Sequence, residues 1–251
     1  MSVKGKTVLV TGASRGIGRT IASVFAAEQA RVAVHYHKNK KSAGETITEL
    51  PGEGHHLFQA NIADAEETKK LIYAVVDTMG SLDILVNNAG IFEEIPFDAL
   101  TFQTWRDTWQ RTLDINLTGP ANMCYLAAKQ MIQKGNGKII NVSSRGAFRG
   151  EPQAPAYGAS KAGLNAMSQS LAVALAPYNI YVYAVAPGFI KTDMTQKLLN
   201  GEKGERIKKQ SPMGRIGFAE EVARTVLFLA GEGTDYLTGA VIDINGASYL
   251  R

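Results

Sequence analysis

The sequence predicts an α/β protein in which one doubly wound parallel sheet of about seven strands carries helices on both faces. Apolar runs of strand length alternate with helical patterns along the whole chain. The strand runs are short, β-branched and nearly all apolar, which is typical of strands covered on both faces. Strand and helix repeated in this way build a parallel sheet through right-handed crossovers. No linker, repeat or low-complexity segment divides the chain, so we expect residues 1–251 to form one domain.

The first half of the chain contains four of the expected strands, separated by three helices with apolar residues at helical spacing. The strands are Thr7–Val10, Arg31–Tyr36, His55–Gln59 and Leu82–Val86. The helices are Gly16–Gln29, Lys41–Leu50 and Ala65–Met79.

The second half continues the same alternation with longer helices. Its strands are Lys138–Val142, Ile180–Ala186 and Val241–Ile244. Its helices are Thr104–Gln133, with a break expected at Gly119-Pro120, then Ala156–Ala176 and Glu220–Ala230. The polar segment Asn200–Lys209 lies between apolar residues. We expect it to be a loop-like flap within a mobile substrate lid around residues 189–212.

Composition excludes several classes of protein. The 27 basic and 23 acidic residues give a net charge of only +4 and are mostly scattered, so nucleic acid is not expected as a partner. The one cysteine, Cys124, cannot form an internal disulfide, which favours a reducing compartment. Four histidines with one cysteine make no metal-ligand set of good spacing. The longest charge-free stretch, Ala162–Ile190, is too polar to span a bilayer, so we expect a cytoplasmic protein without a membrane segment.

A glycine-rich turn, TGASRGIG at residues 11–18, connects the first strand to the first helix. Its glycines allow a tight turn and close approach of a ligand, and the helix N-terminus attracts a pyrophosphate. The alternative is that the glycines only allow the helix to pack closely on the strand, without binding a ligand. Asn87-Asn88-Ala89-Gly90 follows the fourth strand, at the edge of the sheet where ligands bind.

Tyr157 and Lys161 stand four residues apart near the start of a predicted helix, which places them on one face. A nearby ammonium favours a phenolate, so we expect the pKa of Tyr157 to be lowered toward neutral pH. Such a tyrosine is a general acid/base for an alcohol or carbonyl oxygen. Ser144, just past a strand, has a hydroxyl that can hold the same oxygen. The alternative is a surface pair with an extended lysine.

These motifs, with Asn116 and Pro187-Gly188, occur in an order that resembles the short-chain dehydrogenase/reductase family from Lys6 to Gly246. The resemblance implies a Rossmann-type fold, a nicotinamide cofactor and the catalytic residues Asn116, Ser144, Tyr157 and Lys161. It assigns the acid/base to Tyr157, and gives Lys161 the tasks of lowering its pKa and binding the nicotinamide ribose. Ser144 would orient the carbonyl, and Asn116 would hold a water that links Lys161 to a proton relay.

The cofactor and substrate residues follow from the same matching. The expected cofactor residues are Gly12, Ser14, Arg15, Gly16, Ile17, Gly18, Tyr36, His37, Lys38, Asn61, Ile62, Asn88, Ala89, Gly90, Tyr157, Lys161, Pro187, Gly188, Ile190 and Thr192. The expected substrate residues are Ser144, Gly146, Phe148, Glu151, Gln153, Tyr157 and Phe189.

Three features, namely a missing carboxylate and a basic run at the end of the second strand, together with Arg15, predict NADP(H) rather than NAD(H). Enzymes that prefer NAD place a carboxylate there, whereas this chain has Tyr36, followed by His37 and Lys38. Arg15, in the glycine-rich turn, adds a further cation that suits a 2′-phosphate. A solvated basic turn is the alternative.

Within the family, the C-terminal half is most similar to 3-oxoacyl-[acyl-carrier-protein] reductases. This implies reduction of a 3-oxoacyl thioester carried on acyl carrier protein or CoA, by a homotetramer. The basic positions that grip the carrier in such reductases correspond here to Lys134 and Tyr178, so only one is basic. The alternatives are a reductase of another small ketone, sugar or aromatic carbonyl, and a non-catalytic nucleotide-binding relative.

Overall fold

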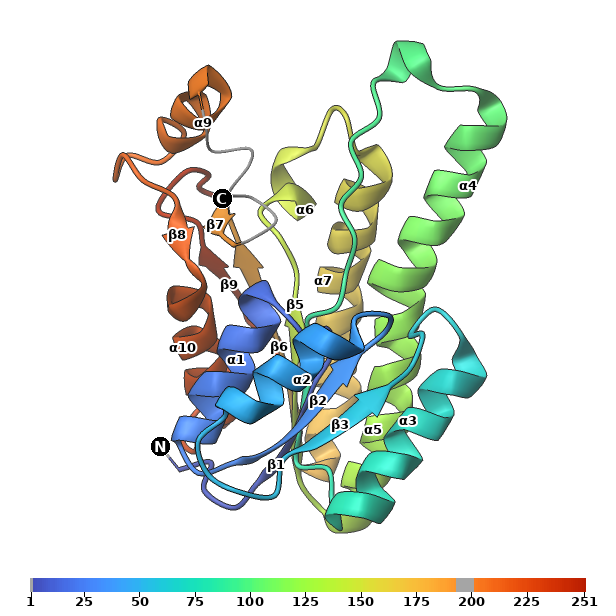
Figure 1. Ribbon diagram of the computed structural model, residues 1–251, viewed down its shortest axis with the longest axis vertical. Coiled ribbons are helices and arrows are strands. Elements are labelled where there is room, and N and C mark those ends of the chain that lie inside the picture. Colours follow the sequence, from blue (N-terminus) through green and yellow to red (C-terminus); the bar gives the residue numbers. More distant parts are fainter. Residues whose placement is uncertain (1, 193–200) are drawn as a thin grey trace.

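The computed structural model describes residues 2–192 and 201–251 (Figure 1). Its central sheet has seven parallel strands in the order β3-β2-β1-β4-β5-β6-β9, which confirms the predicted fold class. The strands are β1 Thr7–Val10, β2 Arg31–Tyr36, β3 His56–Gln59, β4 Ile84–Asn87, β5 Gly137–Val142, β6 Ile180–Pro187 and β9 Val241–Ile244. The strand order changes direction between β1 and β4, which is where ligands bind in open sheets of this kind.

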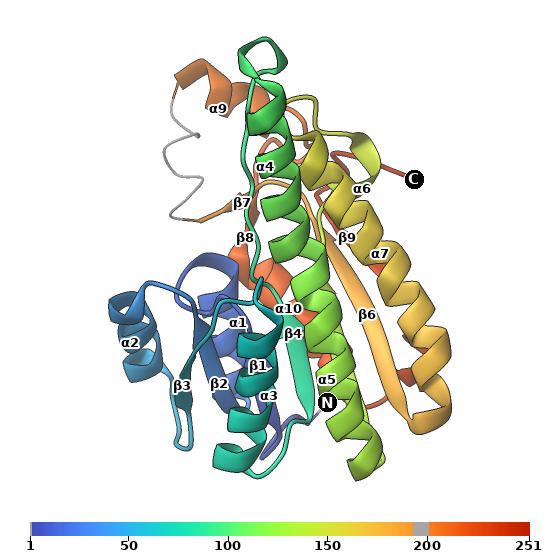
Figure 2. The same ribbon diagram turned by 90° about the vertical axis from the view of Figure 1, so that its right-hand side faces the viewer.

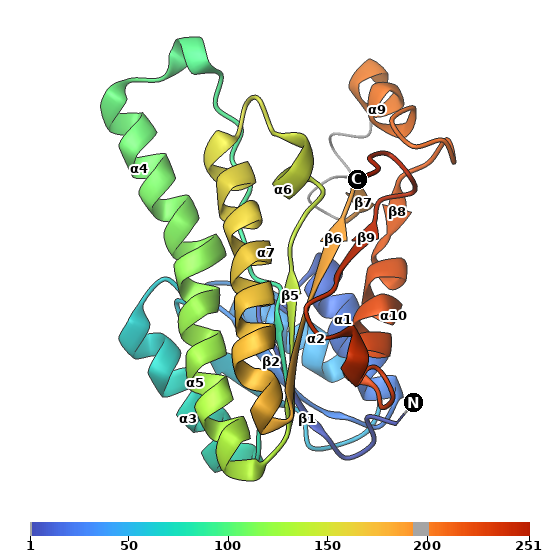
Figure 3. The same cartoon turned by 180° about the vertical axis from the view of Figure 1, so that it is seen from behind.

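Helices cover both faces of this sheet. They are α1 Gly16–Ala27, α2 Lys40–Glu49, α3 Ala65–Met79, α4 Phe102–Leu113, α5 Gly119–Lys134, α7 Pro155–Leu175 and α10 Ala219–Ala230. Alternation along β1 supplies both cores, since Val8 and Val10 pack with α1, α2 and α10 while Leu9 packs with α3, α5 and α7. Figure 3 shows α5 and α7 on one face, and Figure 1 shows α1 and α2 on the other.

One predicted break is wrong. The chain forms a continuous helical rod from α4 through α5 (Figure 2), and the irregularity is a π turn, η2 Asp114–Thr118, that precedes Gly119-Pro120. Pro120 has no N–H for the carbonyl of Asn116, and the Gly119 N–H bonds instead to Asp114 O, five residues back. The proline therefore stays inside the rod, and the π turn carries Asn116.

The region above the carboxyl ends of the strands contains shorter elements. They are η1 Phe97–Ala99, α6 Gly146–Arg149, η3 Ala176–Tyr178, the strands β7 Ile190–Lys191 and β8 Gly217–Phe218, which pair in parallel, α9 Gly201–Lys208 and η5 Asp235–Leu237. The expectation of a loop over Asn200–Lys209 is wrong for residues 201–208, which are helical. Ion pairs at helical spacing, Glu202–Arg206 and Glu205–Lys208, favour this helix. Residues 193–200 of the predicted lid lie outside the described residues.

Residues 2–192 and 201–251 contain neither a membrane-spanning helix nor a cluster of metal-ligating side chains. None of their helices is long and apolar enough to cross a bilayer. They also hold no group of three or more His, Cys, Asp or Glu side chains that could bind a metal ion.

Candidate active site

The glycine-rich turn has a concave backbone surface that side chains in place of its glycines would fill. Gly12 and Gly16 have positive φ values of 65° and 55°, which favour glycine. A Cβ on Gly18 would lie 2.3 Å from the carbonyl oxygen of Gly12. Helix α1 begins at Gly16, and its N-cap residue, Arg15, makes no side-chain cap; no acidic residue lies in the first turn. Its first N–H groups are thus left for an anion, which fits a pyrophosphate.

The segment after β4 is bonded directly to this turn. The hydroxyl of Thr11 accepts from the N–H groups of Asn88 and Ala89 at 2.9 and 3.0 Å, and the Asn88 amide donates to the Thr11 carbonyl at 2.9 Å. Asn88 therefore positions the two segments against each other. Thr11 was quoted in the motif but not expected at the site. The sequence feature that could have indicated this role is a hydroxyl residue directly after an apolar strand.

His35 is a supporting residue that the sequence analysis missed. It is buried in β2, its Nδ1 accepts from the Gly12 N–H at 3.1 Å, and its Nε2 lies 3.0 Å from the carbonyl oxygen of Ala60. Burial lowers its pKa to about 4. The ring is thus neutral at pH 7, with its proton on Nε2, and it connects the glycine-rich turn to the end of β3. The sequence feature that could have indicated this role is a single histidine inside an apolar strand.

Basic residue types are exposed at the end of β2 and in the glycine-rich turn beside it. His37, Lys38 and Arg15 are exposed, and neither Arg15 nor Lys38 makes an ion pair with a carboxylate among residues 2–192 and 201–251. Tyr36 is buried and its hydroxyl donates to Gln59 at 3.5 Å. Lys38 and Arg15 are therefore available to a phosphate.

The remaining expected cofactor residues line the same edge of the sheet. Asn61 accepts from the Ala63 N–H at 3.2 Å, in the turn that leads from β3 to α3. Ile62 is buried, and its carbonyl oxygen lies so close to Gly119 that a Cβ on this glycine would come within 2.5 Å of it. On the opposite side, a Cβ on Gly16 would lie 3.4 Å from the methyl group of Thr192. Other expected residues at this edge are Ser14, Ile17, Pro187, Gly188 and Ile190.

The four expected catalytic residues come from β5, the π turn and α7. Lys161 is only 4% exposed, its Nζ donates to Val142 O at 2.9 Å, and it lies 5.8 Å from the centroid of the Tyr157 ring. This excludes the alternative of a surface pair. Ser144 forms a hydrogen bond with Tyr157 and accepts from the Gly146 N–H at 3.0 Å. The structure therefore brings Ser144, Tyr157 and Lys161 together.

Asn116 is held toward the same centre. Its amide donates to Ile91 O at 2.9 Å and to the Ser160 hydroxyl at 3.2 Å, and its Oδ1 accepts from the Ile91 N–H at 2.9 Å. A Cβ on Gly90 would lie 3.1 Å from Asn116 Oδ1 and 3.6 Å from Lys161 Nζ. The absence of a side chain at Gly90 thus lets Asn116 and Lys161 both lie close to the segment after β4.

The expected effect on Tyr157 is wrong for the free protein. Burial raises the pKa of Tyr157 above its ordinary value, the hydrogen bond from Ser144 lowers it in part, and the charge of Glu151 raises it. Burial also lowers the pKa of Lys161, to about 8. For both groups, the cost of desolvating the charged form is larger than the stabilisation that the other group provides at this distance. Tyr157 is therefore protonated at neutral pH.

The expected substrate residues lie on two sides of this centre. Glu151 lies beside Gly146, where a Cβ would come within 2.9 Å of its Oε1, and Gln153 lines a cavity of about 20 Å³ with Tyr157. Phe148 packs under the Arg251 guanidinium, 4.2 Å from its ring centroid. Phe189 lines a separate cavity of about 160 Å³ that contains no member of the catalytic set. The structure therefore does not gather all five into one pocket.

Phe92 is an aromatic neighbour of Tyr157 that the sequence analysis missed. The two rings meet edge to face, with centroids 4.9 Å apart and planes at 87°. Phe92 is 44% exposed. Phe92 therefore places a partly exposed apolar ring against the Tyr157 ring.

Known proteins resemble the whole chain. A family model described as enoyl-(acyl carrier protein) reductase matches residues 12–247. The 3-oxoacyl-[acyl-carrier-protein] reductase of Staphylococcus aureus (strain Mu50) is 43% identical over 247 residues, covering 98% of each chain. The enzyme of that name from Thermotoga maritima is 40% identical over 249 residues, also covering 98% of each.

A solved structure gives the same result for the fold. The crystal structure of a dehydrogenase/reductase from Sinorhizobium meliloti 1021 matches with a TM-score of 0.92 and 33% identity, over 99% of this chain and 97% of that one. The motif order, the Ser144–Tyr157–Lys161 geometry and these matches agree. The chain belongs to the short-chain dehydrogenase/reductase family, and it is an oxidoreductase that acts on CH–OH and C=O groups.

Proposed function

We propose that the protein reduces the 3-oxo group of an acyl thioester to a 3-hydroxy group, with NADPH as the reductant. The observation that carries this proposal is the hydrogen-bonded Ser144–Tyr157 pair beside buried Lys161. This arrangement suits a carbonyl oxygen, which needs a hydrogen-bond donor and then a proton. The names of the relatives from Staphylococcus aureus and Thermotoga maritima support the 3-oxoacyl group.

The residues present fit the cofactor. The uncapped N-terminus of α1 and the glycines of the turn would hold the pyrophosphate. Exposed Arg15 and Lys38 would bind a 2′-phosphate. Lys161 would bind the nicotinamide ribose, with Pro187-Gly188 and Thr192 on the nicotinamide side. NADPH, when bound, supplies a hydride to the carbonyl carbon.

The chain's own residues handle the proton. Tyr157 Oη, protonated at neutral pH because of its burial, donates a proton to the carbonyl oxygen. Ser144 Oγ holds that oxygen in place. The ammonium of Lys161 stabilises the phenolate that remains. The Asn116 carbonyl, which has no α-helical partner because Pro120 lacks an N–H, would hold a water that returns a proton through Lys161.

The wider organisation follows from the same proposal. Residues 1–251 act as one cytoplasmic domain, with a substrate lid around residues 189–212. Exposed apolar side chains on α5, α7 and η5, namely Tyr125, Val173 and Tyr236, support association into a homotetramer. Lys134, the one basic residue at the positions expected to grip a carrier protein, is already ion-paired with Asp83. Acyl carrier protein and CoA are therefore both to be tested as carriers.

The test is NADPH oxidation with matched substrates. Acetoacetyl thioesters of CoA and of acyl carrier protein are compared with crotonyl thioesters, simple ketones, sugars and aromatic ketones. We expect turnover of the acetoacetyl thioesters and none of the crotonyl thioesters. Turnover of crotonyl thioesters alone would instead favour C=C reduction, the second candidate suggested by the description of the matching family model. Binding of NADPH without turnover of any carbonyl would identify a non-catalytic relative.

Cofactor preference has its own test. We expect kcat/KM to be about tenfold or more higher with NADPH than with NADH, equivalent to about 1.4 kcal/mol or more. Arg15→Ala and Lys38→Ala should each weaken NADPH binding and leave NADH binding nearly unchanged. Tyr36→Asp should shift the preference toward NADH, because it supplies a ribose acceptor and repels the phosphate. Equal efficiency of wild type with the two cofactors would refute this assignment.

A further inference from the structure

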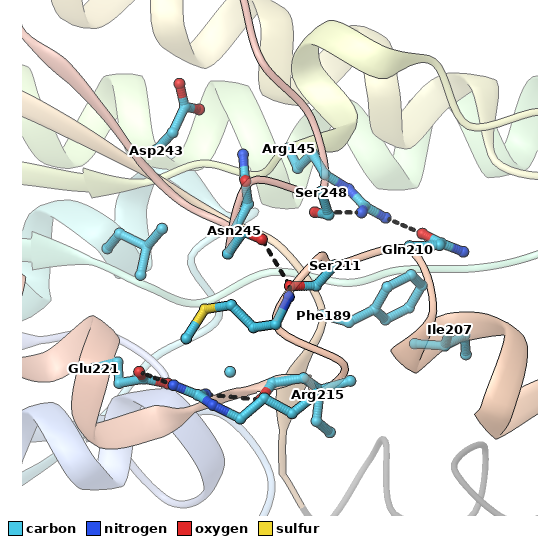
Figure 4. Close-up of a pocket in the computed structure, with 15 residues that line it drawn as sticks. Arg145, Phe189, Ile207, Gln210, Ser211, Arg215, Glu221, Asp243, Asn245 and Ser248 are labelled. Atoms are coloured by element: carbon cyan, nitrogen blue, oxygen red, sulfur yellow. Dashed lines mark hydrogen bonds and ion pairs between the residues drawn. The ribbon is translucent and has the colours of Figure 1, made fainter.

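A second cavity lies apart from the catalytic residues. Its volume is about 160 Å³, and it lies between the turn after β6, the segment that follows α9, and the C-terminal residues (Figure 4). Arg145, Phe189, Gln210, Ser211 and Asn245 are among its lining residues. The cavity is large enough for several water molecules or one small anion.

Arg145 places a positive charge in the wall of this cavity, and no carboxylate among residues 2–192 and 201–251 forms an ion pair with it. Its side chain is buried, with only 4% exposed. The guanidinium donates to Ser248 Oγ at 2.7 Å and to Gln210 Oε1 at 2.9 Å, and it lies 5.2 Å from the centroid of the Phe189 ring. These partners are neutral, and a guanidinium has more N–H donors than these bonds use. A buried cation without an anionic partner is costly.

The other charges of the cavity are already paired. Arg215 holds Glu221 through two hydrogen bonds of 2.9 and 2.8 Å. Asp243 is paired with Arg251 at 2.8 Å. The lining charges other than Arg145 therefore cancel locally, and Arg145 forms no ion pair within 4.0 Å among residues 2–192 and 201–251.

The neighbours of Arg145 do not replace such a partner. Glu151 affects the Arg145 charge only at longer range, and exposed Arg149, which donates to the same Gln210 oxygen at 2.6 Å, adds positive charge. Burial and Arg149 both lower the pKa of Arg145, whereas Glu151 raises it. The local field in this part of the cavity thus favours an anion.

We propose that this cavity binds a compact oxyanion, a phosphate or a carboxylate, and that Arg145 is its counter-ion. The planar fork of arginine matches both groups, and the wall formed by Phe189 shields the pair from water. The oxyanion is either free in solution or carried by the substrate. This site is distinct from the one proposed for the cofactor phosphate at Arg15 and Lys38, which belong to other elements.

The test measures binding of inorganic phosphate without cofactor. Phosphate is titrated against chloride at constant ionic strength, and the ³¹P line width and the melting temperature are recorded for wild type, Arg145→Gln, Arg149→Gln and Arg15→Ala. We expect saturable binding to wild type, Arg149→Gln and Arg15→Ala. In Arg145→Gln, affinity should fall about tenfold or more. Retained NADPH binding verifies that Arg145→Gln is folded, and Arg145→Lys, which keeps the charge, should restore part of the affinity.

Three results would overturn the proposal. Phosphate binding that persists in Arg145→Gln would place the anion elsewhere, and loss only in Arg15→Ala would assign it to the cofactor site. Absence of saturable binding to wild type would mean that the cavity takes no free phosphate. In that case the proposal still requires Arg145→Gln to raise KM for a carbonyl substrate that bears a carboxylate, but not for a neutral thioester. Failure of both effects refutes it.

Kinetics distinguish the two sources of the anion. If the substrate carries the oxyanion, phosphate should compete with a carboxylate-bearing substrate and not with a neutral one. If the oxyanion is free, phosphate should affect both substrates equally. The phosphate titration itself does not depend on the thioester assignment, because it is measured without turnover.

Discussion

Replacing Lys161 with methionine should make the free protein more stable and the enzyme inactive. Lys161 is 4% exposed and has no carboxylate partner among residues 2–192 and 201–251, so its ammonium is desolvated without compensation. Burial lowers its pKa from 10.5 to about 8. Between these two values the unfolded lysine is protonated and the folded one is not. Unfolding therefore takes up a proton, and stability rises with pH across this window.

The magnitude follows from the same shift. At pH 7 the charge lowers the free energy of unfolding by about 3 kcal/mol, and at pH 9.5 by about 1.4 kcal/mol. Methionine removes this penalty but leaves Val142 O without its hydrogen bond from Lys161, which costs about 1 kcal/mol. We expect Lys161→Met to be more stable than wild type by about 2 kcal/mol at pH 7. The difference should vanish near pH 9.5.

Urea unfolding at the two pH values provides the assay. Lys69→Met is the control, because Lys69 is exposed and its replacement separates the effect of burial from that of losing a lysine. A constant difference between Lys161→Met and wild type at pH 7 and pH 9.5 would refute the reasoning. Turnover and NADPH affinity, measured on the same preparations, should both fall, since the charge that destabilises the free protein is the one proposed to serve catalysis.

Three further outcomes are expected. Tyr157→Phe should retain fold and cofactor binding but lose about 10²–10⁴-fold in kcat; retention of more than about a tenth of kcat, with chemistry rate-limiting, contradicts its role. Because burial raises the pKa of Tyr157, carbonyl reduction should stay constant through mildly alkaline pH and fall only above the ordinary tyrosine value of about 10, and alcohol oxidation should rise over that same range; a reduction profile that falls near neutral pH argues against this. Gly18→Ala should lose about 1–3 kcal/mol of stability and weaken NADPH binding, since its Cβ would lie 2.3 Å from Gly12 O. Wild-type stability in urea unfolding, together with wild-type affinity in an NADPH titration, would show that the turn does not require glycine at this position.

The fold class and most elements were predictable because they depend on local patterns. Apolar, β-branched runs marked the seven strands of the sheet, and the glycine-rich turn fell between β1 and α1 as expected. Charge pairing within α9 and the π turn before Pro120 were not foreseen. The short polar helix α9 has no apolar stripe that would reveal it in the sequence. The π turn arises from a change in the backbone hydrogen-bond pattern, and residue spacing does not show that pattern.

The sequence by itself determined which residue types stand at the carboxyl ends of the strands, because the order of strands and loops places them there. Only the tertiary structure decided their electrostatics. Spacing brings Lys161 within one turn of Tyr157, but the packing of α7 on the sheet buries Lys161 and half-buries Tyr157, so desolvation raises the pKa of Tyr157 instead of lowering it. The same holds for His35 and Arg145, whose roles arise from partners distant in the chain. Burial is a property of the assembled layers, and no local pattern contains it.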